Sequence, residues 1–305
     1  MVALMGPTGG GKARLALAAA EATGALLVSC DSMKVYRRLD VGTAKPALAH
    51  RARWRCVDRV EPWERYDAQR FHDEVQAVFA EARAEGRPVL LSGGTMLYMR
   101  AATEGLDAGL PRDEALRARL EAEAEAKGDA ALHARLGAVD PLSAERIHPN
   151  DRRRVVRALE VHTLTGSPLS AVQTSWGRAR AGVERRVFGV ARSREDMDAR
   201  IDDRVDRMLA ADWVEECRGL LADPRGLSRE ARQALGYREL FAWLEGGELE
   251  ALDDVVAAIK THTRRFARKQ LTWLRRLGTE VTWLDTGGGS AEGHLEAVCA
   301  ALNPR

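Results

Sequence analysis

A glycine-rich loop close to the amino terminus constrains the fold more than any other feature of this sequence. Residues 2–5 are apolar, residues 6–11 read Gly-Pro-Thr-Gly-Gly-Gly, and residues 12–22 are rich in Ala and Leu. A buried strand, a glycine loop and a helix in this order gather backbone N–H groups at a helix amino terminus, which attracts anions. Gly6, Gly11 and Lys12 stand at the spacing of a phosphate-binding loop. The residues expected to bind phosphate or diphosphate are Gly6, Pro7, Thr8, Gly9, Gly10, Gly11, Lys12 and Ala13.

The last position of this loop departs from the usual pattern. Such loops ordinarily continue with Ser or Thr, whose hydroxyl ligates Mg²⁺, and this chain has Ala13 instead. A methyl group cannot ligate a metal, so Mg²⁺ is expected to be held by other groups and water, or held weakly. Thr8 could offer a hydroxyl only from another direction. The sequence therefore identifies no metal ligands, and Ala13 counts against an ordinary ATPase or kinase.

Further apolar segments predict a parallel α/β sheet. Residues 2–5, 25–30 and 89–92 read as buried strands, with helical patterns over residues 12–22 and 71–84 between them. In an open parallel sheet, ligands bind at the carboxyl ends of the strands.

Two polar residues follow these strands. Asp31 could bind Mg²⁺ or act as a general base, or it could cap a helix or pair with Lys34. Thr95, after Gly93 and Gly94, could hold a leaving oxygen or cap the next helix.

The chain becomes helical and highly charged after Gly105. Helical patterns are expected near residues 112–127, 129–138, 141–147 and 152–165, the last capped by Asn150 or Asp151. Strand patterns return at residues 186–190 and 281–284. We therefore expect a P-loop-type α/β core over residues 1–105 and 184–305, with a mostly helical insertion domain over residues 106–183.

Composition and charge narrow the functional classes. The four cysteines lack CxxC spacing, which favours free thiols in a reducing cytoplasm over a zinc site. No apolar run is long enough to span a membrane, and the apolar start is too short for a signal peptide. His148 stands without Cys or His neighbours and is expected to be structural.

The formal net charge is only +2, but basic residues are clustered. Residues 260–276 contain seven Lys or Arg and no acid, with Phe266 and Trp273 interleaved. This pattern favours RNA contact. Alternatively, Ile259, Phe266, Leu271 and Leu274 form a buried stripe on a helix whose charges are merely solvated.

Eight short motifs in order along the chain resemble the tRNA dimethylallyltransferase family. They are Gly6-Pro7-Thr8-x-x-Gly11-Lys12, Asp31-Ser32-x-x-x-Tyr36, residues 40–46 (Asp-Val-Gly-Thr-Ala-Lys-Pro), Gly93-Gly94-Thr95-x-Leu97-Tyr98, residues 146–151 (Arg-Ile-His-Pro-Asn-Asp), Arg157-Ala158-Leu159-Glu160, Gly236-Tyr237-Arg238, and Arg268-Lys269-Gln270-x-x-Trp273-Leu274-Arg275. Each motif alone is weak, but eight in register are specific and cover nearly the whole chain.

The resemblance implies a reaction. Dimethylallyl diphosphate would donate its five-carbon group to the exocyclic N6 amine of the adenosine 3′-adjacent to the anticodon, and diphosphate would leave. The family uses Mg²⁺. By residue match, Asp31 would be the general base, Thr95 would contact the reacting groups or the RNA, and Arg117 would clamp the diphosphate. The residues expected to contact the tRNA anticodon stem-loop are Asp31, Ser32, Met33, Lys34, Thr95, Arg117, Arg153, Arg154, Arg157, Arg238, Arg268, Lys269, Trp273 and Arg275.

Three other functions remain to be weighed. A prenyltransferase of free adenine nucleotides would need no long basic helix near the carboxyl terminus. A small-molecule kinase is disfavoured by Ala13. A non-catalytic, nucleotide-gated RNA binder would tolerate Ala13 but has no need of Asp31, Thr95 and Arg117 together. The resemblance further implies a monomer.

Overall fold

The structure is a computed structural model that describes residues 1–105, 110–172, 185–249 and 251–303. The chain packs as two compact units, one of Met1–Thr103 with Ala181–Arg305 and one of Glu104–Arg180. Residues 106–109 and 173–184, where the insertion domain is predicted to begin and end, lie outside the described residues.

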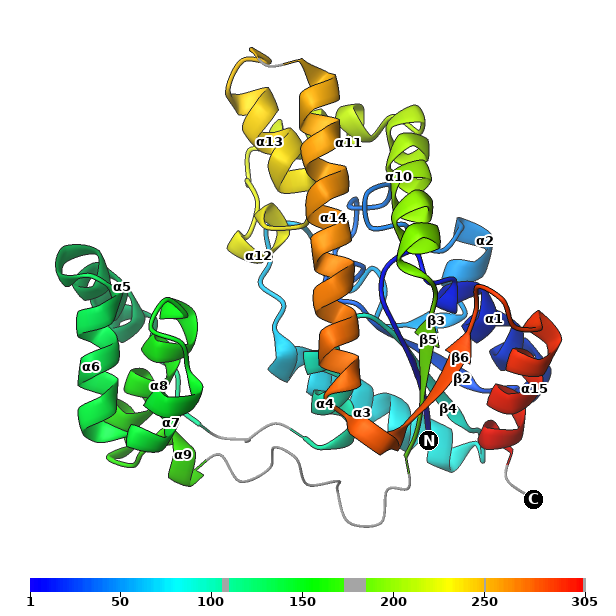
Figure 1. Cartoon of the computed structure of the whole chain (residues 1–305), viewed down its shortest axis with the longest axis horizontal. Helices are drawn as coiled ribbons and strands as arrows, with labels where there is room; N and C mark the ends of the chain where they lie inside the picture. Colours follow the sequence, from blue (N-terminus) through cyan, green and yellow to red (C-terminus); the bar gives the residue numbers. More distant parts are fainter. Residues whose placement is uncertain (106–109, 173–184, 250, 304–305) are drawn as a thin grey trace. The chain divides into compact units, whose positions relative to one another are not determined.

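The larger unit is built on one six-stranded parallel sheet (Figure 1). The strands are β1 (Val2–Met5), β2 (Leu26–Cys30), β3 (Trp54–Arg55), β4 (Val89–Gly93), β5 (Arg186–Ala191) and β6 (Val281–Asp285). Their order is β3-β2-β4-β1-β5-β6, with β1 in the centre. The predicted α/β class and its parallel sheet are confirmed. The strand β3 is not foreseen, because two residues are too few to show any periodicity.

Helices cover both faces of this sheet. On one face, α1 (Lys12–Thr23) and α15 (Ala291–Leu302) pack on alternate strand residues such as Leu4, Leu27 and Leu90. On the other side lie α3 (Ala68–Ala84) and α4 (Met96–Thr103) (Figure 1). Because both faces are covered, the strands read as continuous apolar runs.

The remaining helices of this unit are α2 (Leu48–Arg51), α10 (Arg194–Ala210), α11 (Trp213–Leu221), α12 (Arg229–Arg232), α13 (Tyr237–Glu245), α14 (Leu252–Arg275) and the 3₁₀ turn Gly278–Glu280. Two of them, α10 and α14, bring distant parts of the chain to the loops at the carboxyl ends of the strands. The long helix α14 lies beside α10 (Figure 1), and Met197, Ile201 and Ala267 form their shared apolar contact.

The smaller unit is helical in its described part, as predicted. It contains α5 (Glu114–Lys127), α6 (Asp129–Val139), α7 (Pro141–Arg146), α8 (Arg152–Thr165) and α9 (Leu169–Val172) around their own apolar core. Asp151 caps α8 by accepting a hydrogen bond from the Arg154 N–H at 3.3 Å. His148 accepts one from the Asn150 N–H at 3.1 Å, a local contact that fits its expected structural role.

Two further observations concern the chain as a whole. Within the part of the chain that the structure describes, no helix is long and apolar enough to cross a membrane. Cys30, Cys56, Cys217 and Cys299 are all free thiols, as expected. Burial raises the pKa of the Cys56 thiol to about 12, so this thiol is protonated and unreactive at neutral pH.

Candidate active site

The glycine loop leaves β1 and turns directly into α1. Gly9 and Gly11 have φ angles of +80° and +83°, a conformation that a residue with a Cβ adopts only under strain. A Cβ on Gly6 would lie 2.2 Å from Val190 Cγ2 in the neighbouring strand, so only glycine fits there. The Lys12 ammonium group donates a hydrogen bond to the Pro7 carbonyl at 3.0 Å and so folds back over the loop.

A glutamine from α14 ties this loop to the loop after β4. Gln270 Oε1 accepts a hydrogen bond from the Thr8 N–H at 2.9 Å, and Gln270 Nε2 donates one to the Gly94 carbonyl at 3.0 Å. A Cβ on Gly94 would lie 2.1 Å from Gln270 Nε2. Gln270 belongs to one of the eight motifs, but the motif does not indicate a role for it. The available signal is that it is a neutral residue within a run of cations.

The ends of β2 and β4 bring Asp31 and Thr95 together. Thr95 Oγ1 accepts a hydrogen bond from the Ser32 N–H at 3.2 Å, and the Thr95 N–H donates to the Cys30 carbonyl at 3.0 Å. The Thr95 hydroxyl therefore braces the loop that carries Asp31, a contact that capping of the next helix does not require.

One oxygen of Asp31 orders its own loop and the other is open. Asp31 Oδ1 accepts hydrogen bonds from the Met33 and Lys34 N–H groups at 3.0 and 3.4 Å. Asp31 Oδ2 has no hydrogen-bond partner among the described residues. The helix-capping interpretation is wrong, because residues 32–35 form a turn and no helix begins there. Asp31 Oδ1 orders that turn, while Oδ2 remains available to accept a proton.

Three cations crowd around this carboxylate. Burial lowers the pKa of Lys12 to about 7, with further lowering by Lys34 and Arg204 and an opposing effect of Asp31. Burial also lowers the pKa of Lys34, which Asp31 partly offsets. Lys12 is partly exposed as a residue, but its ammonium group is poorly solvated and surrounded by like charges. A multivalent anion bound here would relieve that repulsion.

Arg204 is a site residue that sequence analysis misses. It lies on α10, where burial lowers its pKa and the nearby Asp31 carboxylate raises it. From the same helix, Arg200 Nε donates to the Gly9 carbonyl at 2.9 Å. No motif marks either arginine, because α10 follows the glycine loop by almost two hundred residues.

Acidic residues on α10 compensate part of the basic segment on α14. The helices are joined by three ion pairs, Lys260 with Asp206 at 2.6 Å, Arg264 with Asp202 at 2.5 Å and Arg268 with Asp198 at 2.9 Å. The interpretation that this segment has no compensating acid is therefore wrong. The segment itself contains no acid, but the folded chain brings the aspartates of α10 beside it.

The outward face of α14 stays cationic and aromatic. Arg265, Lys269, Arg275 and Arg276 are exposed, and the Arg276 guanidinium lies 5.4 Å from the centroid of the Trp273 ring. Phe266 is 44% exposed, so it does not belong to the buried stripe of the alternative interpretation. The inward positions are held by residues such as Ile259, Ala267 and Leu274.

Comparison with known proteins now identifies the family. A family model described as IPP transferase matches residues 34–277. The chain belongs to the IPP transferase family.

Individual members of the family are similar over almost their whole length. A tRNA dimethylallyltransferase from Symbiobacterium thermophilum is 45% identical over 294 residues, covering 95% of this chain and 91% of that protein. One from Geobacter metallireducens is 42% identical, covering 94% and 93%.

Solved structures of similar proteins superpose on this chain over most of its length. The full-length tRNA isopentenylpyrophosphate transferase from Bacillus halodurans superposes with a TM-score of 0.69 at 32% identity, covering 98% of this chain and 94% of that one. A eukaryotic dimethylallyltransferase captured acting on tRNA gives 0.76 at 25% identity, covering 94% and 74%.

The helical unit of this IPP transferase family member gathers two of the predicted arginines around one glutamate. Arg117 Nε and Nη2 each donate to the buried Glu160 carboxylate at 2.9 Å, and Arg157 Nη1 donates to it at 2.5 Å. Burial alone would raise the pKa of Glu160, but hydrogen bonds from Arg117, the Asp113 N–H and Arg157 lower it. The roles of Arg117 and Arg157 towards substrate stay predictions.

The other predicted cations lie on the surface. Arg153 and Arg154 are exposed on α8, and Arg154 pairs with Asp151 at 3.4 Å. Arg238 Nε donates to Glu239 Oε1 at 2.7 Å.

The described residues contain no cluster of protein ligands for Mg²⁺. Among the described residues, no group of three or more His, Cys, Asp or Glu side chains is placed to hold a metal ion. Ala13 carries no ligand atom, and Asp31 has one oxygen engaged and lies in the field of Lys12 and Arg204. Neighbouring cations oppose metal binding just as they favour an anion.

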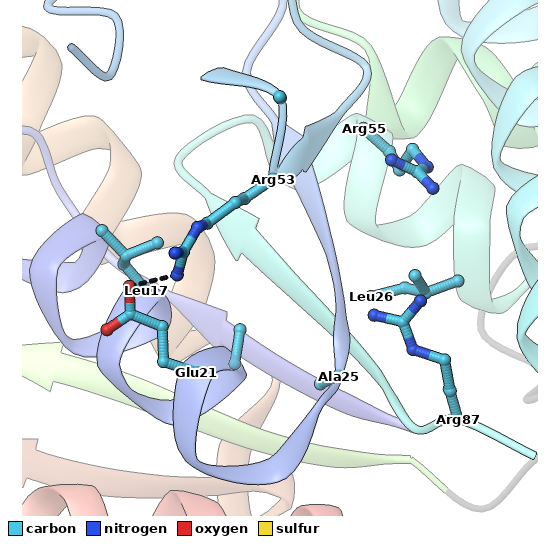
Figure 2. A pocket seen from close by; sticks show the side chains of 9 residues that line it. Leu17, Glu21, Ala25, Leu26, Arg53, Arg55 and Arg87 are labelled. Carbon is cyan, nitrogen blue, oxygen red and sulfur yellow. Dashed lines mark hydrogen bonds and ion pairs between the residues drawn. The ribbon is translucent and has the colours of Figure 1, made fainter. Parts of the chain in front are cut away.

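A separate hollow of about 350 Å³ opens near the amino-terminal end of β2, away from Asp31 (Figure 2). Its lining includes Arg53, Arg55 and Arg87, which pair with Glu21, Glu81 and Glu85 respectively. Because each guanidinium already has a carboxylate partner, this hollow has little excess charge with which to attract an anion.

Proposed function

We propose that this protein transfers the dimethylallyl group of dimethylallyl diphosphate to the N6 amine of the adenosine 3′-adjacent to the anticodon in tRNA, and releases diphosphate. One observation carries the proposal. A phosphate-binding loop after β1 and an open carboxylate oxygen of Asp31 after β2 lie at the carboxyl ends of strands on either side of β4, in a chain of the IPP transferase family.

The cations around the loop stabilise the leaving group. An allylic C–O bond breaks readily because the carbocation is delocalised, so the main task is to hold the departing diphosphate. Lys12, Lys34 and Arg204 supply charge, and the N–H groups of the glycine loop supply hydrogen bonds. Arg117 also contacts the diphosphate in this proposal, for which its Nε and Nη2 must leave the Glu160 carboxylate.

Asp31 acts on the acceptor. The N6 lone pair of adenine is delocalised into the ring, so nitrogen attacks well only as its proton is removed. Asp31 Oδ2 takes that proton, while Oδ1 stays fixed by the Met33 N–H. Thr95 holds the Asp31 loop through its hydrogen bond with Ser32. The base must leave its stack to reach this position.

The outward face of α14 binds the RNA. Lys269, Arg275 and Trp273 offer phosphate contacts and a stacking surface. Arg268 contributes less net charge because Asp198 pairs with it. Ser32, Met33, Lys34, Arg153, Arg154, Arg157 and Arg238 complete the proposed contacts to the anticodon stem-loop.

Three finer points belong to the same proposal. Mg²⁺, the cofactor expected for the family, would be held by the oxygens of the diphosphate and by water, because the described residues bring together no group of three or more His, Cys, Asp or Glu side chains. The enzyme works as a monomer. It works in the cytoplasm, where its tRNA substrate is found.

The direct test is transfer of label. Radiolabelled dimethylallyl diphosphate, Mg²⁺ and unmodified tRNA are incubated with the protein, and label is followed into RNA. We expect label only in tRNAs with adenosine at the predicted position. Absence of label from all of them would sink the proposal.

A substitution then tests the proposed base. Asp31→Asn keeps an oxygen for the Met33 N–H but cannot take a proton. We expect kcat to fall by about 10²–10⁴-fold, with tRNA affinity unchanged. An equal loss of tRNA binding would instead make Asp31 a structural residue.

A further inference from the structure

Arg192 lies beside the glycine loop and belongs to none of the eight motifs. It directly follows β5, which pairs with β1, the strand that leads into the loop. A Cβ on Gly11 would lie 3.8 Å from Arg192 Nη2, and no other atom outside the adjoining chain comes within 4 Å of that position. The guanidinium therefore borders the open side of Gly11, the last glycine before Lys12.

Only part of this guanidinium is satisfied. Arg192 Nη1 donates to Asp196 Oδ2 at 2.6 Å. Arg192 Nε is enclosed and has no hydrogen-bond partner among the described residues, and the whole side chain is only 14% exposed. An enclosed donor without an acceptor is unfavourable. Nη2, which borders the open side of Gly11, is the nitrogen that a phosphate oxygen can reach, and a charged donor makes a strong hydrogen bond to such an oxygen.

The same end of the loop lacks its usual means of neutralising phosphate. A hydroxyl next to the loop lysine normally brings Mg²⁺ to the phosphate oxygens, and Ala13 cannot do so. The described residues offer no cluster of carboxylates, histidines or thiols instead. Arginine provides a permanent positive charge with fixed geometry and needs no metal.

We propose that Arg192 binds the diphosphate at the Gly11 end of the loop and supplies charge that a hydroxyl-bound Mg²⁺ would otherwise provide. As a result, the protein holds diphosphate with little dependence on Mg²⁺. On binding, Nη2, the nitrogen that borders Gly11, acquires a phosphate acceptor, while Asp196 keeps Nη1 in place. The inference rests on the proposed function only in taking the natural ligand to be the diphosphate of the prenyl donor.

A purely structural role makes a different prediction. If Arg192 serves only to pair with Asp196 at the start of α10, its replacement should lower thermal stability and leave anion binding intact. Binding of an anion therefore separates the two roles.

Calorimetric titration of the full chain with inorganic pyrophosphate tests the inference. We expect the wild-type affinity in EDTA to lie within about threefold of its value in Mg²⁺. Arg192→Gln should weaken pyrophosphate binding in EDTA about tenfold, equivalent to about 1.4 kcal/mol. Arg192→Lys, which keeps the charge but loses the planar fork, should recover part of this loss.

Two matched variants serve as controls. Arg194→Gln removes a nearby cation whose side chain is 73% exposed, and it should leave pyrophosphate affinity unchanged. Ala13→Thr restores the missing hydroxyl, and it should make pyrophosphate binding markedly stronger in Mg²⁺ than in EDTA.

Two results would overturn the inference. One is a wild-type protein that binds pyrophosphate only in Mg²⁺, and the other is equal affinity of wild type and a folded Arg192→Gln variant. Failure of the proposed function looks different. Pyrophosphate would bind in EDTA in an Arg192-dependent manner, but no tRNA would accept the prenyl group.

Discussion

At the scale of single residues, Lys12 is a cation whose charge depends on its surroundings. Its pKa lies near 7 because the ammonium group is poorly solvated and close to Lys34 and Arg204. A bound diphosphate favours the charged form and raises this pKa, so anion binding takes up a proton.

The sign of the pH dependence follows from that proton. Below about pH 7 Lys12 is already charged in the free protein, and diphosphate affinity is at its full value. Above pH 7 the free protein loses the proton that the complex keeps, so affinity falls, by at most about tenfold per pH unit for one proton. Pyrophosphate titrations from pH 6 to 9 measure this change.

A lysine-to-arginine variant corrects for the titration of pyrophosphate itself. Lys12→Arg keeps its charge throughout this range, so its affinity should fall less steeply than that of the wild type. Parallel pH profiles for the two proteins would show that deprotonation of Lys12 does not cause the loss of affinity.

The site residues that follow strands could be predicted from the sequence. The residues that contact them from distant segments of the chain could not. Asp31 and Thr95 follow apolar runs that mark strands, and parallel strands align their carboxyl ends. Arg204 and Gln270 reach the loop only through packing of α10 and α14, and Arg192 reaches it only through pairing of β5 with β1. No local sequence pattern encodes either arrangement.

At the scale of elements, α14 has two faces with opposite electrostatic character. Towards α10, its cations at i, i+4 spacing meet aspartates at the same spacing. The outward face includes exposed cations such as Lys269, which has no ion-pair partner among the residues that the structure describes. The sequence could predict a basic helix, but the pairing joins segments about sixty residues apart.

The two faces should respond differently to substitution. Lys269→Gln removes an outward charge, so it should weaken tRNA binding and reduce the dependence of log K on log salt by about one counterion. Arg268→Gln should have a smaller effect on binding, because Asp198 offsets the Arg268 charge. Filter binding of tRNA across a salt series measures both.

An exposed cation on α10 provides the control for these measurements. Arg207 is 72% exposed and pairs with Asp203 on its own helix, so Arg207→Gln should leave the salt dependence unchanged. Equal effects of Lys269→Gln and Arg207→Gln would remove α14 from the RNA interface.

At the scale of the whole molecule, the site forms only when residues far apart in the sequence meet at the carboxyl ends of the strands. The parallel fold class follows from apolar runs alternating with helical patterns. The link between the two glycine loops could not be predicted from such patterns. It consists of a single side chain, Gln270, which contacts Thr8 and Gly94. Packing of α14 therefore affects the phosphate-binding loop directly, because Gln270 fixes the direction of the Thr8 N–H group.

Gly94→Ala tests that link, and a second substitution should reverse part of its effect. The new methyl group would meet Gln270 Nε2 at 2.1 Å, so the glutamine must move and release the Thr8 N–H. We expect weaker pyrophosphate binding and a stability loss of about 1–3 kcal/mol.

Gln270→Ala alone loses both hydrogen bonds but also removes the obstacle. Because the two residues act through one contact, the double variant should be about as stable as Gln270→Ala, well short of an additive loss. Chemical denaturation of the four proteins gives the coupling, and additive losses would show that Gly94 is required for a reason other than Gln270.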